Sequence, residues 1–99
     1  MIGKGTPVAK YQVLYWKDIP SVVEATDANG SAKVQLSDRF QVLIDSVAMR
    51  LGLAGTDEYL DQWDHGGEQE RPGSSQEVAK AVAQELEAKF AEFRDRGLG

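Results

Sequence analysis

The sequence predicts a single α+β domain in which a small antiparallel sheet carries two long amphipathic helices on one face. Runs rich in β-branched and aromatic residues come first, a hairpin signal joins two of them, and two helical stripes of apolar residues follow. The expected order is β-β-β-α-α-β-α. A chain of 99 residues holds one core of useful size. We therefore expect a flexible lead-in at 1–7, one domain at 8–96 and a short tail at 97–99.

The first three elements are expected to be strands. Residues 8–17 read V-A-K-Y-Q-V-L-Y-W-K, without Gly or Pro, and neither alternate face is purely polar, which is typical of a central strand. Pro20 ends this run because proline has no N–H to give to a ladder. Two further strands, 21–28 and 31–36, flank the Asn-Gly pair at 29–30. That pair favours a tight type I′ hairpin turn.

The first long helix is expected to begin after Ser37 or Asp38 and to end at Gly52. Apolar residues recur there at the spacing of one helix face. This stripe consists of Phe40, Leu43, Ile44, Val47, Ala48 and Leu51. The neighbouring Asp45 falls at the edge of the stripe, where we expect it to be exposed.

A short helix and a short strand come next in the predicted order. Thr56 is expected to cap the helix, and the glycines at 66–67 end this region. The side chains expected to face inward are Tyr59, Leu60 and Trp63. Residues 68–71 read E-Q-E-R, which suits a short polar strand at the edge of the sheet.

The second long helix is expected to begin with a capping box and to end at Gly97. Ser74 and Glu77 have the S-x-x-E spacing in which each residue satisfies a free backbone N–H of the other. The apolar stripe of this helix consists of Val78, Val82, Leu86, Phe90 and Phe93.

Composition limits the kinds of partner and of chemistry. Lys plus Arg is 11 and Asp plus Glu is 16, which gives a formal net charge of −5 and argues against binding to nucleic acid or to an anionic membrane. Residues 1–55 hold six basic and five acidic groups, whereas residues 56–99 hold five and eleven. The absence of cysteine excludes disulfides and thiolate-bound metals. No secretory signal or membrane-spanning run is present, so we expect a cytoplasmic protein. We also expect no cofactor.

One group of side chains has the composition of a metal site. It consists of Asp57, Asp61, Asp64 and His65, and such oxygen and imidazole donors bind divalent ions. The alternative is that Asp57 stabilises the N-terminus of the short helix and the others are solvated. A small enzyme centred on His65 is a further hypothesis, although acid–base catalysis requires a positioned partner for this single histidine.

The first strand also predicts an interaction surface. If the helices cover Leu14 and Trp16, alternation places Tyr11, Val13 and Tyr15 on a half-exposed aromatic ridge. The lysines expected beside this ridge are Lys10, Lys17 and Lys33. Aromatic residues with basic neighbours are typical of anchors at protein interfaces, so we expect a protein partner with an acidic, apolar groove. The alternative is that the ridge is one more packed face of the sheet.

Three segments carry a resemblance to a known family. Residues 9–21 read A-K-Y-Q-V-L-Y-W-K-D-I-P-S, residues 39–50 read R-F-Q-V-L-I-D-S-V-A-M-R, and residues 69–74 read Q-E-R-P-G-S before a helix rich in Ala and Glu. Together they resemble the small bacterial "virulence factor" domain family. The Y-W-K-D-I-P block is the most specific part of this resemblance.

The resemblance implies a module and no particular chemistry. In that family the domain occurs alone and within longer conserved virulence factor C proteins, beside a scaffold domain and helical repeats. It brings no catalytic residues to this chain. We therefore expect an interaction or accessory module without catalytic activity of its own. The neighbourhood of stand-alone members implies an alternative, an accessory or ligand-binding protein in corrinoid- and folate-dependent methyl transfer or in a metallocofactor pathway.

Overall fold

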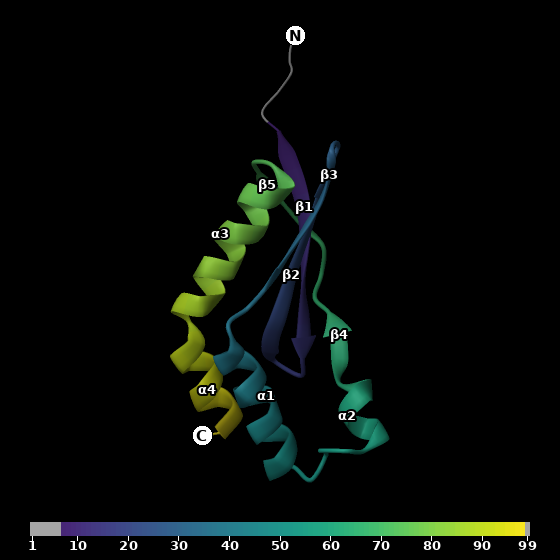
Figure 1. Ribbon diagram of the computed structural model, residues 1–99, viewed down its shortest axis with the longest axis vertical. Helices are drawn as coiled ribbons and strands as arrows, with labels where there is room; N and C mark the ends of the chain where they lie inside the picture. The colour runs from purple at the N-terminus through teal and green to yellow at the C-terminus, as the bar shows by residue number, and fades with distance from the viewer. Residues whose placement is uncertain (1–6, 99) are drawn as a thin grey trace.

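The computed structural model describes residues 7–98, which form a five-stranded antiparallel sheet with helices packed against it (Figure 1). The predicted α+β class is confirmed. The elements in chain order are β1 (Val8–Trp16), β2 (Ile19–Asp27), β3 (Gly30–Gln35), α1 (Asp38–Arg50), α2 (Asp57–Asp61), β4 (Trp63–His65), β5 (Gln69–Pro72), α3 (Ser75–Ala88) and α4 (Phe90–Leu98). Most of the lead-in predicted at 1–7, and Gly99 of the predicted tail, lie outside the described residues.

The sheet is built around β1. Its strands follow the order β3-β2-β1-β4, and β5 also pairs with β1, so two short strands share one edge of the first strand. The predicted hairpin joins β2 and β3, but its two turn residues are Ala28 and Asn29, because Gly30 already pairs with Asp27. Asn29 does not have the positive φ that a type I′ turn requires, so the turn predicted at 29–30 is wrong. The Asp27 carboxylate stabilises its turn, because Oδ1 accepts the backbone N–H of Asn29 at 2.7 Å and that of Gly30 at 2.9 Å.

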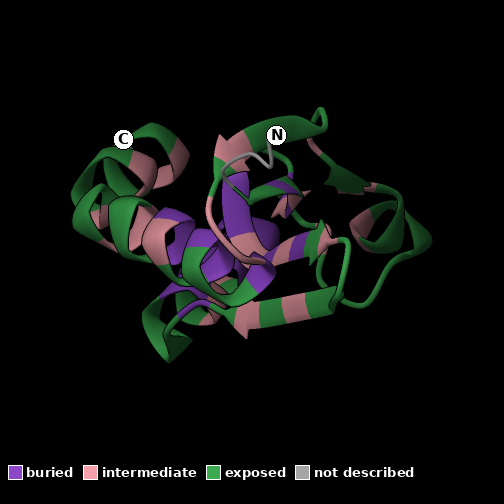
Figure 2. Ribbon diagram, turned by 90° about the horizontal axis from the view of Figure 1, so that it is seen from above, coloured by how far each residue is buried: buried purple, intermediate pink, exposed green. Residues whose placement is uncertain are grey.

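Helices α1 and α3 pack on the same face of the sheet, as the two apolar stripes predict. Figure 1 shows α3 alongside the sheet and α1 below it, and Figure 2 shows the buried residues gathered between these helices and the strands. The stripe of α1 is buried except for Leu51, which is exposed, so that part of the prediction is wrong. Within residues 7–98, no helix is long and apolar enough to span a membrane.

A shift of register changes which residues of β1 enter this core. Leu14 pairs with Val22, but Tyr15 pairs with Pro20, so one residue of β2 is passed over. An extra residue on one strand breaks the alternation between faces. Val13 and Trp16 are therefore both buried, although strict alternation places them on opposite faces.

The C-terminal part of the chain forms two helices where one is predicted. The capping box at Ser74 and Glu77 is present and begins α3. The helix stops after Ala88, and α4 then continues to Leu98. Gly97 lies inside α4, so the predicted helix end at this glycine is wrong. A second difference is β4, because Trp63 pairs with Trp16 in the sheet instead of continuing the short helix.

Candidate functional site

Several of the site residues predicted from the sequence gather on the face of β1, β2 and β3 that points away from α1 and α3. The register of the sheet places residues of neighbouring strands side by side in rows on this open face. One row holds Ser31, Thr26, Lys10 and Glu70, the next holds Lys33, Glu24 and Gln12, and the third holds Gln35, Val22, Leu14 and His65. We call the residues of these three rows the open face.

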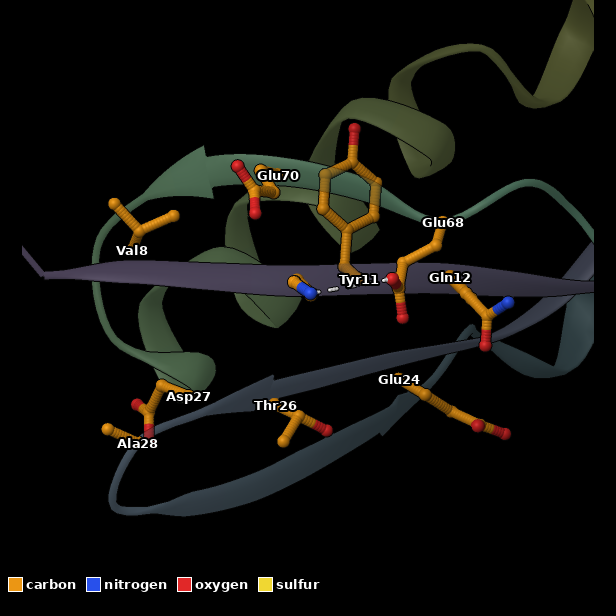
Figure 3. Close-up of a pocket in the computed structure, with 10 residues that line it drawn as sticks. Val8, Tyr11, Gln12, Glu24, Thr26, Asp27, Ala28, Glu68 and Glu70 are labelled. Carbon is orange, nitrogen blue, oxygen red and sulfur yellow. Dashed lines mark ion pairs between the residues drawn. The ribbon is translucent and has the colours of Figure 1, made fainter.

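A hollow of about 540 Å³ lies over the first two rows (Figure 3). Its lining comes from β1, from the β2–β3 hairpin and from β5 with the residue before it. The residues that line it are Val8, Lys10, Tyr11, Gln12, Glu24, Thr26, Asp27, Ala28, Glu68 and Glu70. The hollow is open, and most of its lining residues are polar or charged, which suits contact with the side chains of another molecule better than enclosure of an apolar ligand.

Carboxylates dominate the charge of this hollow. Lys10 is its one basic group, and its Nζ lies 3.9 Å from Oε1 of Glu68. Asp27 is directed elsewhere, because its Oδ2 accepts the backbone N–H of Ser75 at 2.7 Å. Glu24 and Glu70 thus remain without a lysine or arginine within 4 Å in the part of the chain that the structure describes.

The predicted aromatic ridge does not form one surface. Val13 is only 6% exposed and pairs with Val23 in the core, so its place on an exposed ridge is wrong. The cause is that the helices cover the Val13 side of β1, and the register shift then brings Trp16 to that side as well. Of the predicted interaction residues, Lys10 and Lys33 lie on the open face, and Lys17 lies in the turn after β1.

The two tyrosines of the predicted ridge are half-buried and already have partners. The Tyr11 hydroxyl donates to Oε1 of Gln69 at 2.9 Å, and the Arg71 guanidinium lies 5.5 Å from the centre of its ring. The Tyr15 ring lies against Gly66, where an added Cβ would come within 3.0 Å of Cε2. Burial, together with the neighbouring Tyr11, raises the pKa of Tyr15 above its ordinary value. The Tyr15 hydroxyl is therefore neutral near pH 7.

The residues of the predicted metal site are not brought together. Asp61 ends α2, and Oδ1 of Asp64 accepts the backbone N–H of His65 at 2.9 Å. The His65 ring instead lies on the open face, with Nε2 3.4 Å from Oε2 of Glu24. Residues 7–98 contain no group of three or more His, Cys, Asp or Glu side chains placed to hold a metal ion.

The glutamates that line the hollow are the site residues that sequence reasoning missed. Glu24 belongs to a stretch of β2 in which Val22, Glu24 and Thr26 alternate with two buried residues. That alternation marks the exposed side of β2 and could have placed Glu24 on it. Glu68 and Glu70 gave no such signal, because only the pairing of β5 with β1 brings them beside Lys10.

Comparison with known proteins agrees with the resemblance seen in the sequence. The model of a family described as "Virulence factor" matches residues 14–98, which is most of the chain. A search of curated proteins and a search of solved structures each return no match. The matched region contains β2, β3, all four helices, β4, β5 and the end of β1. The chain therefore belongs to the virulence factor domain family.

Proposed function

We propose that this domain is a protein-interaction or accessory module that binds a partner protein through its open face. The observation that carries the proposal is the one-sided packing of the helices, because α1 and α3 leave a broad sheet surface that no other element within residues 7–98 covers. Half-buried Leu14 and Val22 lie side by side on this surface and supply an apolar patch beside the hollow and its charged lining residues. An apolar centre with a polar rim is the usual anatomy of a protein interface.

The charge of the hollow supports a basic partner segment. Glu24, Glu68 and Glu70 line it with a single lysine, and complementary charge favours a partner that supplies arginine or lysine there. This differs from the acidic partner that the three lysines of the sequence suggest. The difference arises because the fold brings Glu68 and Glu70 from a distant part of the chain to the side of Lys10.

Charge reversal on the open face tests the proposal. We expect Glu24→Lys with Glu70→Lys to remove the bound partner, measured by quantitative mass spectrometry of proteins that co-purify from cells that naturally make this protein. The matched control is Glu58→Lys with Glu92→Lys, which changes the net charge equally on α2 and α4. We expect at least a tenfold loss in the first variant and no loss in the control. Equal retention in both variants contradicts the proposal.

A titration separates this proposal from the ligand-binding alternative. Calorimetry with cobalamin, with tetrahydrofolate and with divalent cations is expected to give no heat of binding. The contrary result is saturable binding of one of these ligands that persists in the Glu24→Lys, Glu70→Lys variant. It would contradict a role exercised only through the open face. It would favour a role in the methyl-transfer or metallocofactor pathway.

A further inference from the structure

The outer side of α1 carries large apolar side chains that the fold does not cover. Val42 is 61% exposed and Met49 is 71% exposed. They lie seven residues apart, so two helical turns place them on one line along the helix, with Ser46 between them. We call Val42, Ser46 and Met49 the α1 ridge. Among the described residues, the other large apolar side chains with such exposure are Val8, Leu51 and Leu60, and the last two lie at the same end of the molecule.

A shallow hollow follows each side of the α1 ridge. In Figure 1, α4 lies to the left of α1 and α2 to its right. The hollow toward α4 has a volume of about 300 Å³ and is lined by Arg39, Val42, Leu43, Ser46, Phe90, Arg94 and Leu98. The hollow toward α2 has a volume of about 320 Å³ and is lined by Asp45, Ala48, Met49, Ala54, Gly55 and Tyr59.

A ridge with a hollow on each side is the surface shape into which another helix packs. Ridges made by residues three and four apart on one helix fit into the grooves of another. The small Ser46 leaves a gap between Val42 and Met49 that a partner side chain can enter, and the flexible methionine adapts to the shape of its neighbour. A helix laid along α1 would remove the exposed apolar surface from water, which favours the bound state.

The charges beside the ridge select the kind of helix. The hollow toward α4 is lined by two arginines and by no carboxylate. Arg39 is held in place by Glu87, whose Oε1 accepts from its Nη2 at 3.0 Å, and it lies 4.5 Å over the Phe90 ring. Arg94 is exposed on α4 and pairs with the adjacent Asp95. A partner with acidic residues on this flank would complement both guanidinium groups.

We propose that the α1 ridge docks an amphipathic helix of a partner protein, with apolar residues at i, i+3 or i+4 and i+7 and with acidic residues on the flank next to α4. This surface is independent of the open face, because α1 lies on the opposite side of the sheet. A chain with both surfaces can hold a basic segment and an acidic helix at the same time.

Site-specific photocrosslinking tests this inference. A benzophenone amino acid replaces Val42 or Met49 in cells that naturally make the protein, and the crosslinked peptides are sequenced. The control position is Gln84, which is exposed on α3. We expect both ridge positions to capture the same amphipathic, acidic-flanked segment at least tenfold above the control. Capture no greater than at Gln84, capture of a basic or non-amphipathic segment, or capture of a second copy of this chain overturns the proposal.

Affinity measurements with the captured segment as a synthetic peptide give a second test. We expect Met49→Gln to weaken binding at least fivefold in fluorescence anisotropy, because it replaces an apolar contact with a polar one. Arg94→Glu is expected to weaken binding to a similar extent and to reduce its dependence on salt. The control Lys80→Glu, on α3, and the open-face pair Glu24→Lys with Glu70→Lys should leave the affinity unchanged. If Arg94→Glu leaves the affinity unchanged, the proposal that the partner helix carries acidic residues next to α4 is overturned.

Discussion

Trp16 joins the end of β1 to the segment that follows α1. Its side chain has no exposed surface, and its Nε1 donates to the carbonyl oxygen of Tyr59 at 2.8 Å. The two rings also pack together, with their centres 5.4 Å apart. One side chain therefore fixes both the core beneath the sheet and the position of α2, which has no buried residue of its own.

Replacing this indole measures how strongly it holds the two parts together. Trp16→Phe removes the hydrogen bond and leaves a small cavity, so we expect the free energy of unfolding to fall by about 2 kcal/mol. Urea unfolding followed by circular dichroism gives this value. The control is Trp63→Phe, at a half-buried position, where a smaller loss is expected. An equal loss of unfolding free energy in both variants would show that the deeper burial of Trp16 does not make it more important for stability than Trp63.

Asp27 links a local turn to a distant helix. Its carboxylate accepts the N–H groups of Asn29 and Gly30 within the hairpin and that of Ser75 at the start of α3. The bond from Ser75, followed by that from Asn29, lowers the pKa of Asp27 below its ordinary value. The ionised form is therefore favoured by the folded state.

This linkage makes stability depend on pH in a stated direction. Because the folded-state pKa of Asp27 is lowered, its contribution is complete above the unfolded value of about 4 and is lost as the pH falls through the folded value. We expect Asp27→Asn to lower the urea midpoint at pH 7 and to make it fall less steeply below pH ~4. Glu85, whose pKa is lowered by the Arg71 hydrogen bond, preserves part of the slope. An unchanged slope contradicts this account.

At the scale of elements, sequence patterns predicted those structures that depend on neighbours along the chain. The stripe of α1 correctly placed Phe40, Ile44 and Val47 in the core, because a helix repeats its faces through local hydrogen bonds. The capping box of α3 is local in the same sense. Leu60 departs from its pattern, since α2 is too short to bury its outer side, and this residue is exposed.

The parts that sequence patterns missed depend on pairing between distant strands. The register shift near Leu14 arises from the pairing of β1 with β2, and no residue type or pattern within β1 predicts it. It allows Trp16 and Val13 to be buried together, so the burial of Trp16 did not place Val13 on the surface. The strand β4 forms because residues 63–65 pair with β1, where Trp63 lies opposite Trp16. Which residues form the candidate site was therefore decided by the sheet as a whole.

The contact between α4 and α1 leads to a prediction about Gly97. A Cβ at this position would lie 3.0 Å from Cγ2 of the buried Val47. Gly→Ala inside a helix ordinarily stabilises by about 0.5–1 kcal/mol, but here we expect Gly97→Ala to destabilise by about 1 kcal/mol because the core must yield. Urea unfolding of both single variants and the double variant measures the coupling.

The double variant is the control for this prediction. In the Val47→Ala background the space for the new methyl group exists, so Gly97→Ala is expected to be neutral or stabilising there. The same loss of stability in both backgrounds would mean that Val47 is not the group that requires a glycine at position 97.

At the scale of the whole molecule, stability is expected to be uneven. The helix α3 buries five residues against the sheet, whereas α4 buries none and rests on α1 and the end of α3. Segments with few buried contacts open more often. We expect the amides of α4 to exchange with deuterium faster than those in the middle of α3, measured by hydrogen exchange and mass spectrometry. Equally slow exchange in both helices would contradict this difference.

The pairing of β5 with β1 also sets the order in which the domain can be completed during its synthesis. Gln69 lies 58 positions after Tyr11, the residue that it pairs with. At about 5–20 residues per second, it is therefore made about 3 to 12 s later. For that time the outer edge of β1 has an unpaired backbone, which is the kind of edge that sticks to other chains. Strand β1 thus leaves the ribosome well before β4 and β5, and the newly made chain depends on these later strands to protect the edge of β1.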